Sequence, residues 1–193
     1  MGTAISKRAL PPLAALALAA AGCGGSAATR SSSASGYGWL VPAAAPAGWH
    51  TVTIPSGAAL SYPPAWRQLP GDRGTATVVL RDSNDDYLGY LNLTPRQGDE
   101  TLGNWSSFRV EHNAEEGDLQ VKKLDSASGL RFRSGTGTCV RDSYTTTVKN
   151  EFIELACLVQ GSRGSSVIVA AAPPREWSVI APVLERAVSA FTT

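Results

Sequence analysis

The stretch Cys139–Cys157, "CVRDSYTTTVKNEFIELAC", contains two runs with strand character separated by a short polar segment. Partners in an antiparallel pair have residue numbers with a constant sum. A three-residue loop, Thr147–Val148–Lys149, therefore places Cys139 opposite Cys157, whereas a two-residue turn at Lys149–Asn150 pairs Cys139 with Gln160. Because a disulfide needs Cα atoms within about 7 Å, a bond between the two cysteines favours the longer loop or a bulge.

Apolar and polar residues alternate over the chain around this hairpin, from Gly48 onward, with turn residues between the runs. Pro55 and Gly57 mark a first turn, and "RDSNDDYL" (Arg81–Leu88) marks a second hairpin connection. The pattern predicts strands at His50–Ile54, Ala58–Tyr62, Thr75–Arg81, Tyr87–Thr94, Leu119–Leu124, Leu130–Phe132 continuing towards Thr146, Glu151–Val159 and Ser166–Ala171.

Two segments have helical periodicity. The first begins at Thr101 or Asn104 and ends near Glu116, with Asn104 as the expected N-cap and Gly117 as the stop signal. The second covers residues 175–190, and Pro182 inside it predicts a kink or a later start. Its apolar stripe consists of Trp177, Ile180, Ala181, Leu184, Val188 and Phe191. One meandering antiparallel sheet with an inserted and a terminal helix predicts the α+β class.

This order of elements resembles the PsbP-like fold, which recurs in small actinobacterial lipoproteins of the LpqN type. The resemblance covers Trp49 to Phe191 and rests on "LSYPPAW" (Leu60–Trp66), a helix containing Trp105, and the closing "W…PVLERAVSAF" (Trp177–Phe191). It implies an antiparallel sheet packed between helices and a role in binding or assembly, since such domains are mostly not enzymes. The scarcity of lysine beside plentiful arginine and alanine is typical of a high-GC bacterial genome.

The N-terminus has the layout of an export signal, with Lys7 and Arg8 before a short apolar stretch. "LAAAGC" resembles the bacterial lipobox, with Ala20, Ala21 and Gly22 preceding Cys23. The resemblance implies cleavage between Gly22 and Cys23 and a diacylglycerol thioether on Cys23. Two acyl chains at one residue give stable anchoring, which one chain does not. The alternative is an ordinary signal peptide in which Cys23 has no role.

The residues after the lipobox are mainly Gly, Ser, Ala and Pro and show no apolar periodicity. Such a composition predicts a disordered tether. The predicted organisation is a signal peptide (1–22), the lipidated Cys23 with its tether (23–47), and an α+β globular domain (48–193). Trp39 and Leu40 interrupt the tether, and their contact is either with the bilayer interface or with the domain.

Charge and cysteine usage limit the compartment and the partners. The net charge is +1, and without Lys7 and Arg8 the chain has one more acidic than basic residue, so no nucleic-acid partner is expected. An oxidising, extracytoplasmic location predicts a disulfide between Cys139 and Cys157, contributing about 3 kcal/mol. Free buried thiols and a catalytic cysteine are the alternatives. "RFRSG" with Lys122 and Lys123 predicts a solvent-facing basic patch able to contact anionic lipid headgroups.

The sequence predicts no catalytic residue, no metal ligand and no cofactor. His50 and His112 are the two histidines, and neither is accompanied by a G-x-S-x-G elbow. Glu115 and Glu116 can share a helical face with His112, but a metal site needs three or four ligands. "DSNDD" (Asp82–Asp86) begins like a calcium loop, yet Tyr87 stands where glycine is required, which favours a turn.

Four tryptophans, at positions 49, 66, 105 and 177, are candidates for the core or for a ligand site. Trp66 follows two prolines and is the one expected to be partly exposed, as a possible ligand surface. The sequence thus predicts a lipid-anchored module on the outer face of the cell membrane, bound through Cys23, with a cell-envelope protein or hydrophobic ligand as partner. The alternatives are an extracytoplasmic hydrolase using His112 and nearby carboxylates, and a carrier of a hydrophobic ligand.

Overall fold

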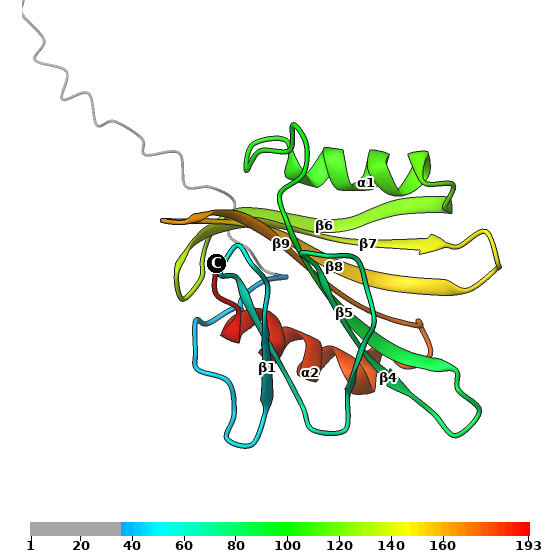
Figure 1. Ribbon diagram of the computed structural model, residues 1–193. Coiled ribbons are helices and arrows are strands. Elements are labelled where there is room, and N and C mark those ends of the chain that lie inside the picture. Colours follow the sequence, from blue (N-terminus) through cyan, green and yellow to red (C-terminus); the bar gives the residue numbers. More distant parts are fainter. Residues whose placement is uncertain (1–35) are drawn as a thin grey trace, which may run out of the picture. The chain divides into compact units, whose positions relative to one another are not determined.

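The computed structural model describes residues 36–193, so the predicted signal peptide, the lipobox residues Ala20, Ala21 and Gly22, and Cys23 lie outside the described part. The predicted α+β class is confirmed (Figure 1). In chain order the elements are β1 (His50–Thr53), β2 (Ala59–Tyr62), β3 (Arg67–Leu69), β4 (Ala76–Arg81), β5 (Tyr87–Pro95), α1 (Trp105–Glu115), β6 (Leu119–Arg131), β7 (Gly135–Thr145), β8 (Glu151–Gly161), β9 (Gly164–Ala172) and α2 (Trp177–Ala190).

The strands form two sheets rather than the single meander predicted. A seven-stranded antiparallel sheet has the order β3-β4-β5-β9-β8-β7-β6, and β1 and β2 form a separate hairpin. Strand β3 has three residues, too few for a periodicity to predict it. The runs predicted at Leu119–Leu124 and Leu130–Phe132 belong, apart from Phe132, to one strand, β6, with three register shifts against β7. The predicted continuation towards Thr146 is wrong, because residues 132–134 turn the chain into a separate strand, β7.

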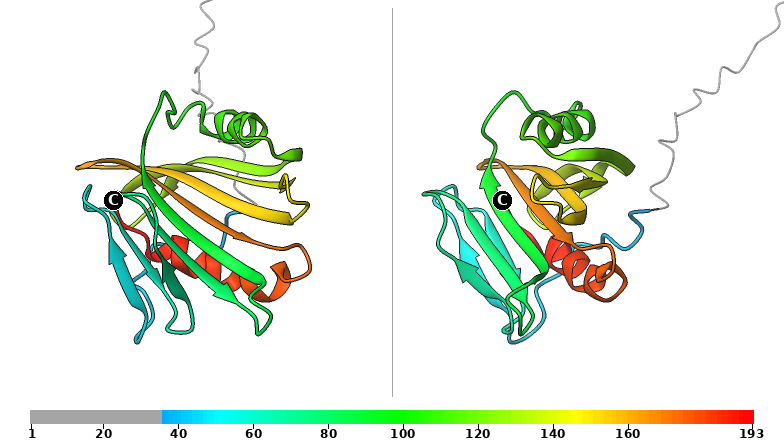
Figure 2. Two further views of the ribbon diagram at one scale, coloured as in Figure 1. Left: turned by 45° about the vertical axis from the view of Figure 1, so that its right-hand side comes forward. Right: turned by 90° about the vertical axis from the view of Figure 1, so that its right-hand side faces the viewer.

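The sheet lies between the two helices, as the resemblance implied (Figures 1 and 2). Helix α1 packs over β6, β7 and β8 on one face, and α2 packs on the other face against β9, β5 and the β1–β2 hairpin. The main core lies under α2. Its fully buried members include Leu60, Leu91, Leu93, Ile168, Leu184 and Phe191. Neither helix in residues 36–193 has both the length and the apolar character needed to cross a bilayer.

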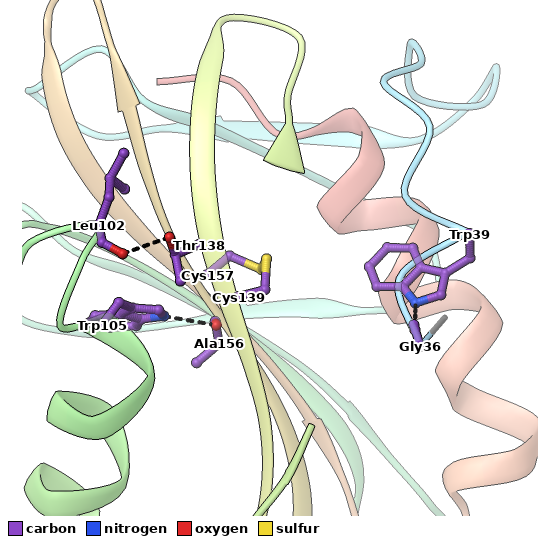
Figure 3. The surroundings of a disulfide bond; sticks show 8 residues. All are labelled: Gly36, Trp39, Leu102, Trp105, Thr138, Cys139, Ala156 and Cys157. Atoms are coloured by element: carbon purple, nitrogen blue, oxygen red, sulfur yellow. Dashed lines mark hydrogen bonds between the residues drawn. A yellow bond between two sulfur atoms is a disulfide. The ribbon is translucent and has the colours of Figure 1, made fainter. Parts of the chain in front are cut away.

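The β7–β8 hairpin has the register that the three-residue loop predicts. Cys139 pairs with Cys157, and the loop Thr147–Lys149 is closed by Thr146 N donating to Asn150 O over 2.8 Å. The two cysteines form a disulfide bond with Cα atoms 4.1 Å apart, and both are fully buried. The sulfur atoms belong to the core under α2, while Trp105 lies on the other face of the same strands (Figure 3).

Residues 36–47, which we call the N-terminal strap, are packed on the domain. The prediction of a disordered tether is therefore wrong for these residues. Tyr37 is 4% exposed and belongs to the main core, and Trp39 and Leu40 pack against that core. Trp39 Nε1 donates to Gly36 O over 2.9 Å, and Ala43 N donates to Ser189 O over 3.1 Å. The folded domain therefore includes residues 36–47 and does not begin at Gly48, because burial of the aromatic side chains outweighs the flexible composition around them.

The helix ends differ in part from the predictions. Asn104 occupies the N-cap position of α1 but its side chain makes no cap bond; Asn104 Oδ1 accepts from Thr101 N at 2.6 Å instead. Gly117 has a φ of 96° directly after α1, as expected of a stop residue. Helix α2 begins at Trp177 and continues through Pro182, so the predicted later start is not observed.

Candidate functional site

Two acidic side chains lie opposite each other beneath α1. Asp142 on β7 and Glu154 on β8 are partners in the strand register, and both are completely buried. Neither residue was singled out from the sequence above. The signal was present in the alternation: Asp142 shares a strand face with the buried Val140 and Tyr144, so its side chain must point inward.

Glu154 is held by a guanidinium and two phenols. Arg109, from α1, donates from Nε to Oε1 at 2.6 Å and from Nη2 to Oε2 at 2.9 Å. The hydroxyls of Tyr90 and Tyr144 lie 3.4 and 3.3 Å from Oε2 and 2.7 Å from each other. Burial disfavours the charged guanidinium, but Glu154 outweighs this and raises the pKa of Arg109. The two-pronged contact fixes α1 on the sheet.

Asp142 has no hydrogen-bond partner for either carboxyl oxygen among the described residues. Burial, and then the charge of Glu154, raises the pKa of Asp142 to about 8. At neutral pH this side chain therefore holds its proton, because ionising it would place two buried negative charges side by side.

A groove runs beside α1 over the part of the sheet that the helix leaves open, and its larger hollow is mainly polar while its smaller hollow is mainly apolar. We call it the α1 groove; it consists of two adjoining hollows of about 310 and 210 Å³. Five residues line both hollows: Thr94, Gln97, Arg109, His112 and Val167. The larger hollow is completed by Thr77, Tyr90, Asn92, Glu116 and Val169, and the smaller by Pro95, Gly98, Glu100, Trp105 and Phe108.

The groove side chains are positioned by hydrogen bonds. Asn92 on β5 donates from Nδ2 to the Oγ1 of its register partner Thr77 on β4 over 2.8 Å. The buried Glu100 accepts from the backbone N–H groups of Gln97 and Gly98, each at 2.8 Å, which orders the loop at the groove end. Tyr90 and Arg109 line this groove and also contact Glu154 in the buried cluster, which consists of Asp142, Glu154, Arg109, Tyr90 and Tyr144. Neither Asp142 nor Glu154 lines the groove.

His112 lies on the rim of the α1 groove. Its ring stacks on Phe108 at 5.7 Å, and its Nε2 is 3.2 Å from Glu116 Oε1. The shared helical face predicted for His112 and its carboxylates is thus observed with Glu116. Both side chains are substantially exposed, at 41% and 60%. The described residues contain no group of three or more His, Cys, Asp or Glu placed to hold a metal ion.

The "DSNDD" segment is a hairpin turn, as favoured over a calcium loop. Asp82 Oδ1 accepts from Asn84 N at 2.8 Å and from Asp86 N at 3.0 Å, and Asp85 has a φ of 69°. A hollow of about 760 Å³ lies beside this turn and the β7–β8 loop. It is lined by exposed turn residues of both charges, without the buried, hydrogen-bonded side chains that shape the α1 groove.

Trp66 is buried, at 5% exposure, so the predicted ligand surface at this residue is wrong. Its ring fits over Gly89: a Cβ there would lie 3.1 Å from Trp66 Cη2 and 3.0 Å from Ile180 Cγ2. The missing side chain on β5 makes room for the indole between the sheet and α2. Trp105 is also buried, and its Nε1 donates to Ala156 O over 2.9 Å (Figure 3).

No family model matches the chain, and no curated protein matches it in sequence. The cyanobacterial PsbP protein CyanoP from Synechocystis sp. PCC 6803 is similar in structure, with a TM-score of 0.55 and 14% identity over 77% of this chain and 94% of CyanoP. The chain therefore has a PsbP-like fold.

Two looser structural matches have TM-scores below 0.5. LpqN of Mycobacterium tuberculosis, described as involved in cell envelope biogenesis, has a TM-score of 0.46 and 14% identity over 75% of this chain and 89% of its own. A Pseudomonas aeruginosa protein of unknown function, PA94, has a TM-score of 0.44 and 12% identity over 75% of this chain and 96% of its own. Matches this loose support no inference about this chain.

Proposed function

We propose that this chain is a lipid-anchored lipoprotein on the outer face of a bacterial cell membrane, and that its domain binds a polar ligand or partner in the α1 groove without catalysing a reaction. The lipobox-like Ala20–Cys23 supports the anchor, with a diacylglycerol thioether on Cys23. The PsbP-like fold, which the sequence resemblance associates with binding or assembly, supports the non-enzymatic role.

The observation that carries the binding proposal is the half-covered sheet face. Helix α1 packs over β6–β8 and leaves β4, β5 and β9 open beside it. The open part presents hydroxyl and amide groups, from Thr77, Asn92 and Thr94, opposite the α1 side chains Arg109 and His112. Preformed hollows with convergent polar groups are typical of ligand sites.

The state of the two buried acidic groups excludes them from catalysis, which leaves the exposed His112–Glu116 pair as the groove pair to test. Glu154 is engaged by Arg109, Tyr90 and Tyr144, and Asp142 is sealed beneath α1. A general acid or base must come within hydrogen-bond reach of its substrate, and a group that does not line the groove cannot do so. Substituting His112 with alanine should therefore change no turnover of ester or glycan substrates, and loss of a wild-type activity in this variant would contradict the non-enzymatic role.

The anchor is tested by metabolic labelling with radioactive palmitate in a bacterial host. We expect label in the wild-type chain and in a Cys139→Ser, Cys157→Ser control, and none in Cys23→Ser, which should also leave the particulate fraction. The control matters because it removes the other cysteines while keeping Cys23. Equal labelling, or an equally particulate Cys23→Ser chain, would disprove the lipid anchor.

The binding site is tested by native mass spectrometry of the full chain extracted from membranes. Binding in the polar larger hollow predicts no co-purified lipid besides the anchor, and binding of added muropeptides, which are polar fragments of the cell wall. Thr77→Ala should weaken that binding, whereas Thr51→Ala should not, although Thr51 is also bonded across a strand pair, to Ser61 at 3.0 Å. Extra mass from a bound apolar lipid would favour the hydrophobic carrier instead.

A further inference from the structure

Strand β6 is the outer strand at one end of the seven-stranded sheet, and with the residues after it forms a basic edge (residues 119–133). The basic edge has four exposed cationic side chains and one acidic one, Asp125. The cations are Lys122, Lys123, Arg131 and Arg133. Leu119 and Leu124 on the same strand are 45% and 43% exposed, which is unusual for large apolar residues in the described part of the chain.

The described chain begins at this edge. Gly36 lies so close to Asp125 of β6 that a Cβ on Gly36 would overlap the Asp125 carboxylate. The position of Gly36 is fixed because the next residue, Tyr37, is buried in the core. The right-hand view of Figure 2 shows the first described residues on the β6–β7 side of the sheet, away from β3 and β4. The first described residue, Gly36, therefore lies beside the basic edge.

The length of chain before Gly36 limits how far the domain can lie from an anchor at Cys23. Twelve residues separate the two positions, and a chain of that length spans at most about 45 Å. Strands are about 4.8 Å apart, so the opposite end of the sheet, at β3, lies roughly 29 Å farther along it. Turning the β3 end towards the membrane would use most of the length of the chain between Cys23 and Gly36. The basic edge can face the membrane without this extension.

Charge favours the same orientation. The end of the sheet away from the basic edge has charges of both signs, with Asp82, Asp85 and Asp86 in the β4–β5 turn and Arg67, Arg73 and Arg81 on β3, β4 and the loop between them, so it lacks the net positive charge of the basic edge. An anionic lipid surface attracts basic residues close to it and repels acidic ones, and each lysine or arginine near it strengthens binding about fivefold. We propose that the basic edge faces the membrane in the anchored protein and contacts anionic lipid headgroups; this orientation rests on the proposed anchor at Cys23.

An unpaired edge strand can also take up a strand of another protein, but β6 has features that oppose this. Its pairing with β7 shifts register at three places, and lysines stand at Lys122 and Lys123. Bulges and lysines are the means by which natural edge strands avoid pairing. The same lysines suit a headgroup layer, so the structure favours lipid over a partner strand.

The test uses the mature chain, Cys23–Thr193, coupled through Cys23 to a maleimide lipid in nanodiscs. Coupling at one site is feasible because the other two cysteines form the disulfide. Chemical coupling supplies the anchor, so the result does not depend on whether cells lipidate Cys23. Nitroxide-labelled headgroups then broaden the amide NMR signals of residues near the surface. One set of nanodiscs contains phosphatidylglycerol, which is anionic, and the other contains phosphatidylcholine alone.

We expect the strongest broadening over residues 119–133 and the weakest over residues 82–86 in the anionic nanodiscs, with the contrast lost in phosphatidylcholine or at 0.5 M salt. Lys122→Gln with Lys123→Gln should lower the equilibrium constant for contact of the basic edge with the headgroups about 25-fold. Arg67→Gln with Arg73→Gln, which removes two exposed charges at the β3–β4 end, should leave it unchanged. Uniform broadening, broadening centred on another face, or the same pattern in both lipids would overturn the proposal.

Discussion

The two faces of the seven-stranded sheet differ in what they bury. The face under α2 is closed and apolar, and it contains the disulfide bond and the packed aliphatic core. The face under α1 is half covered, and beneath the helix it buries Asp142, Glu154 and the guanidinium of Arg109. Apolar burial stabilises a fold by about 25 cal/mol per Å², whereas a buried ion pair contributes little net stability. The first face therefore holds the fold together, and the second fixes the position of α1 beside an open groove.

The largest expected effect comes from leaving Glu154 without its partner. Arg109→Ala should lower the free energy of unfolding by about 3–5 kcal/mol, because a charge that stays buried loses its compensation. Urea denaturation measures this. The matched control is Asp85→Asn, which breaks the exposed Arg81–Asp85 pair and should change the free energy of unfolding far less than Arg109→Ala does.

A double variant separates the ion pair from the space it fills. Arg109→Met combined with Glu154→Leu should recover most of the lost stability, because apolar residues of similar size replace both charges. A double variant as unstable as Arg109→Ala would show that the α1 face depends on its charges for folding.

The opposite face is tested by removing its covalent bond. Cys139→Ala with Cys157→Ala should lower the free energy of unfolding by about 3 kcal/mol, since the bond closes a loop with a sequence separation of 18. Wild-type protein denatured under reducing conditions should match the variant. Muropeptide binding should persist, because the disulfide bond faces away from the α1 groove. A loss of binding in the folded variant would contradict the assignment of stability and binding to different faces.

The pH dependence of stability should report Asp142. Its pKa is about 8 in the folded chain and near 3.8 in the unfolded chain, so between these values the unfolded state releases a proton that the folded state keeps. The free energy of unfolding should therefore fall as pH rises from about 4 to 8 and then level off. Asp142→Asn should remove this slope, whereas the half-exposed control Asp125→Asn should retain it.

The smallest expected effect is that of replacing tyrosine with phenylalanine. The change in the free energy of unfolding should have opposite signs on the two faces. The Tyr37 hydroxyl is buried with no hydrogen-bond partner among residues 36–193, so Tyr37→Phe should raise stability by up to about 1 kcal/mol. The Tyr144 hydroxyl is bonded to Tyr90 and Glu154, so Tyr144→Phe should lower stability by about 1–2 kcal/mol. Thermal denaturation of both variants gives the signs, and equal signs would contradict the two-face description.

Local signals predicted the hairpin and most elements well. The register of Cys139 and Cys157 follows from a loop of three residues, and the stop of α1 follows from Gly117; both depend on residues a few positions apart. The burial of Trp66 and Tyr37 depends instead on where distant residues leave room, such as Gly89 beneath the Trp66 ring. The strap was predicted to be a tether from its composition alone. Composition does not show which part of the folded domain can bury an aromatic side chain.

The buried cluster could have been found in part from the sequence. Glu154 alternates in phase with Phe152, Ala156 and Leu158, so a charged residue on an apolar strand face was visible as an exception. Its partner Arg109 comes from a helix 45 residues earlier, and no spacing rule connects them. The α1 groove was not predictable either, because it depends on α1 covering only part of the sheet.

The most direct test of the account is a map of ligand contacts on the two faces. The full chain with Cys23→Ser, labelled with ¹⁵N, is titrated with muropeptides while its amide NMR shifts are followed. We predict shifts confined to the residues lining the α1 groove on β4, β5, β9 and α1, and their loss in Thr77→Ala but not in Thr51→Ala. Shifts centred on α2 and the β1–β2 hairpin, or equal responses of the two variants, would contradict the assignment of binding to the α1 face.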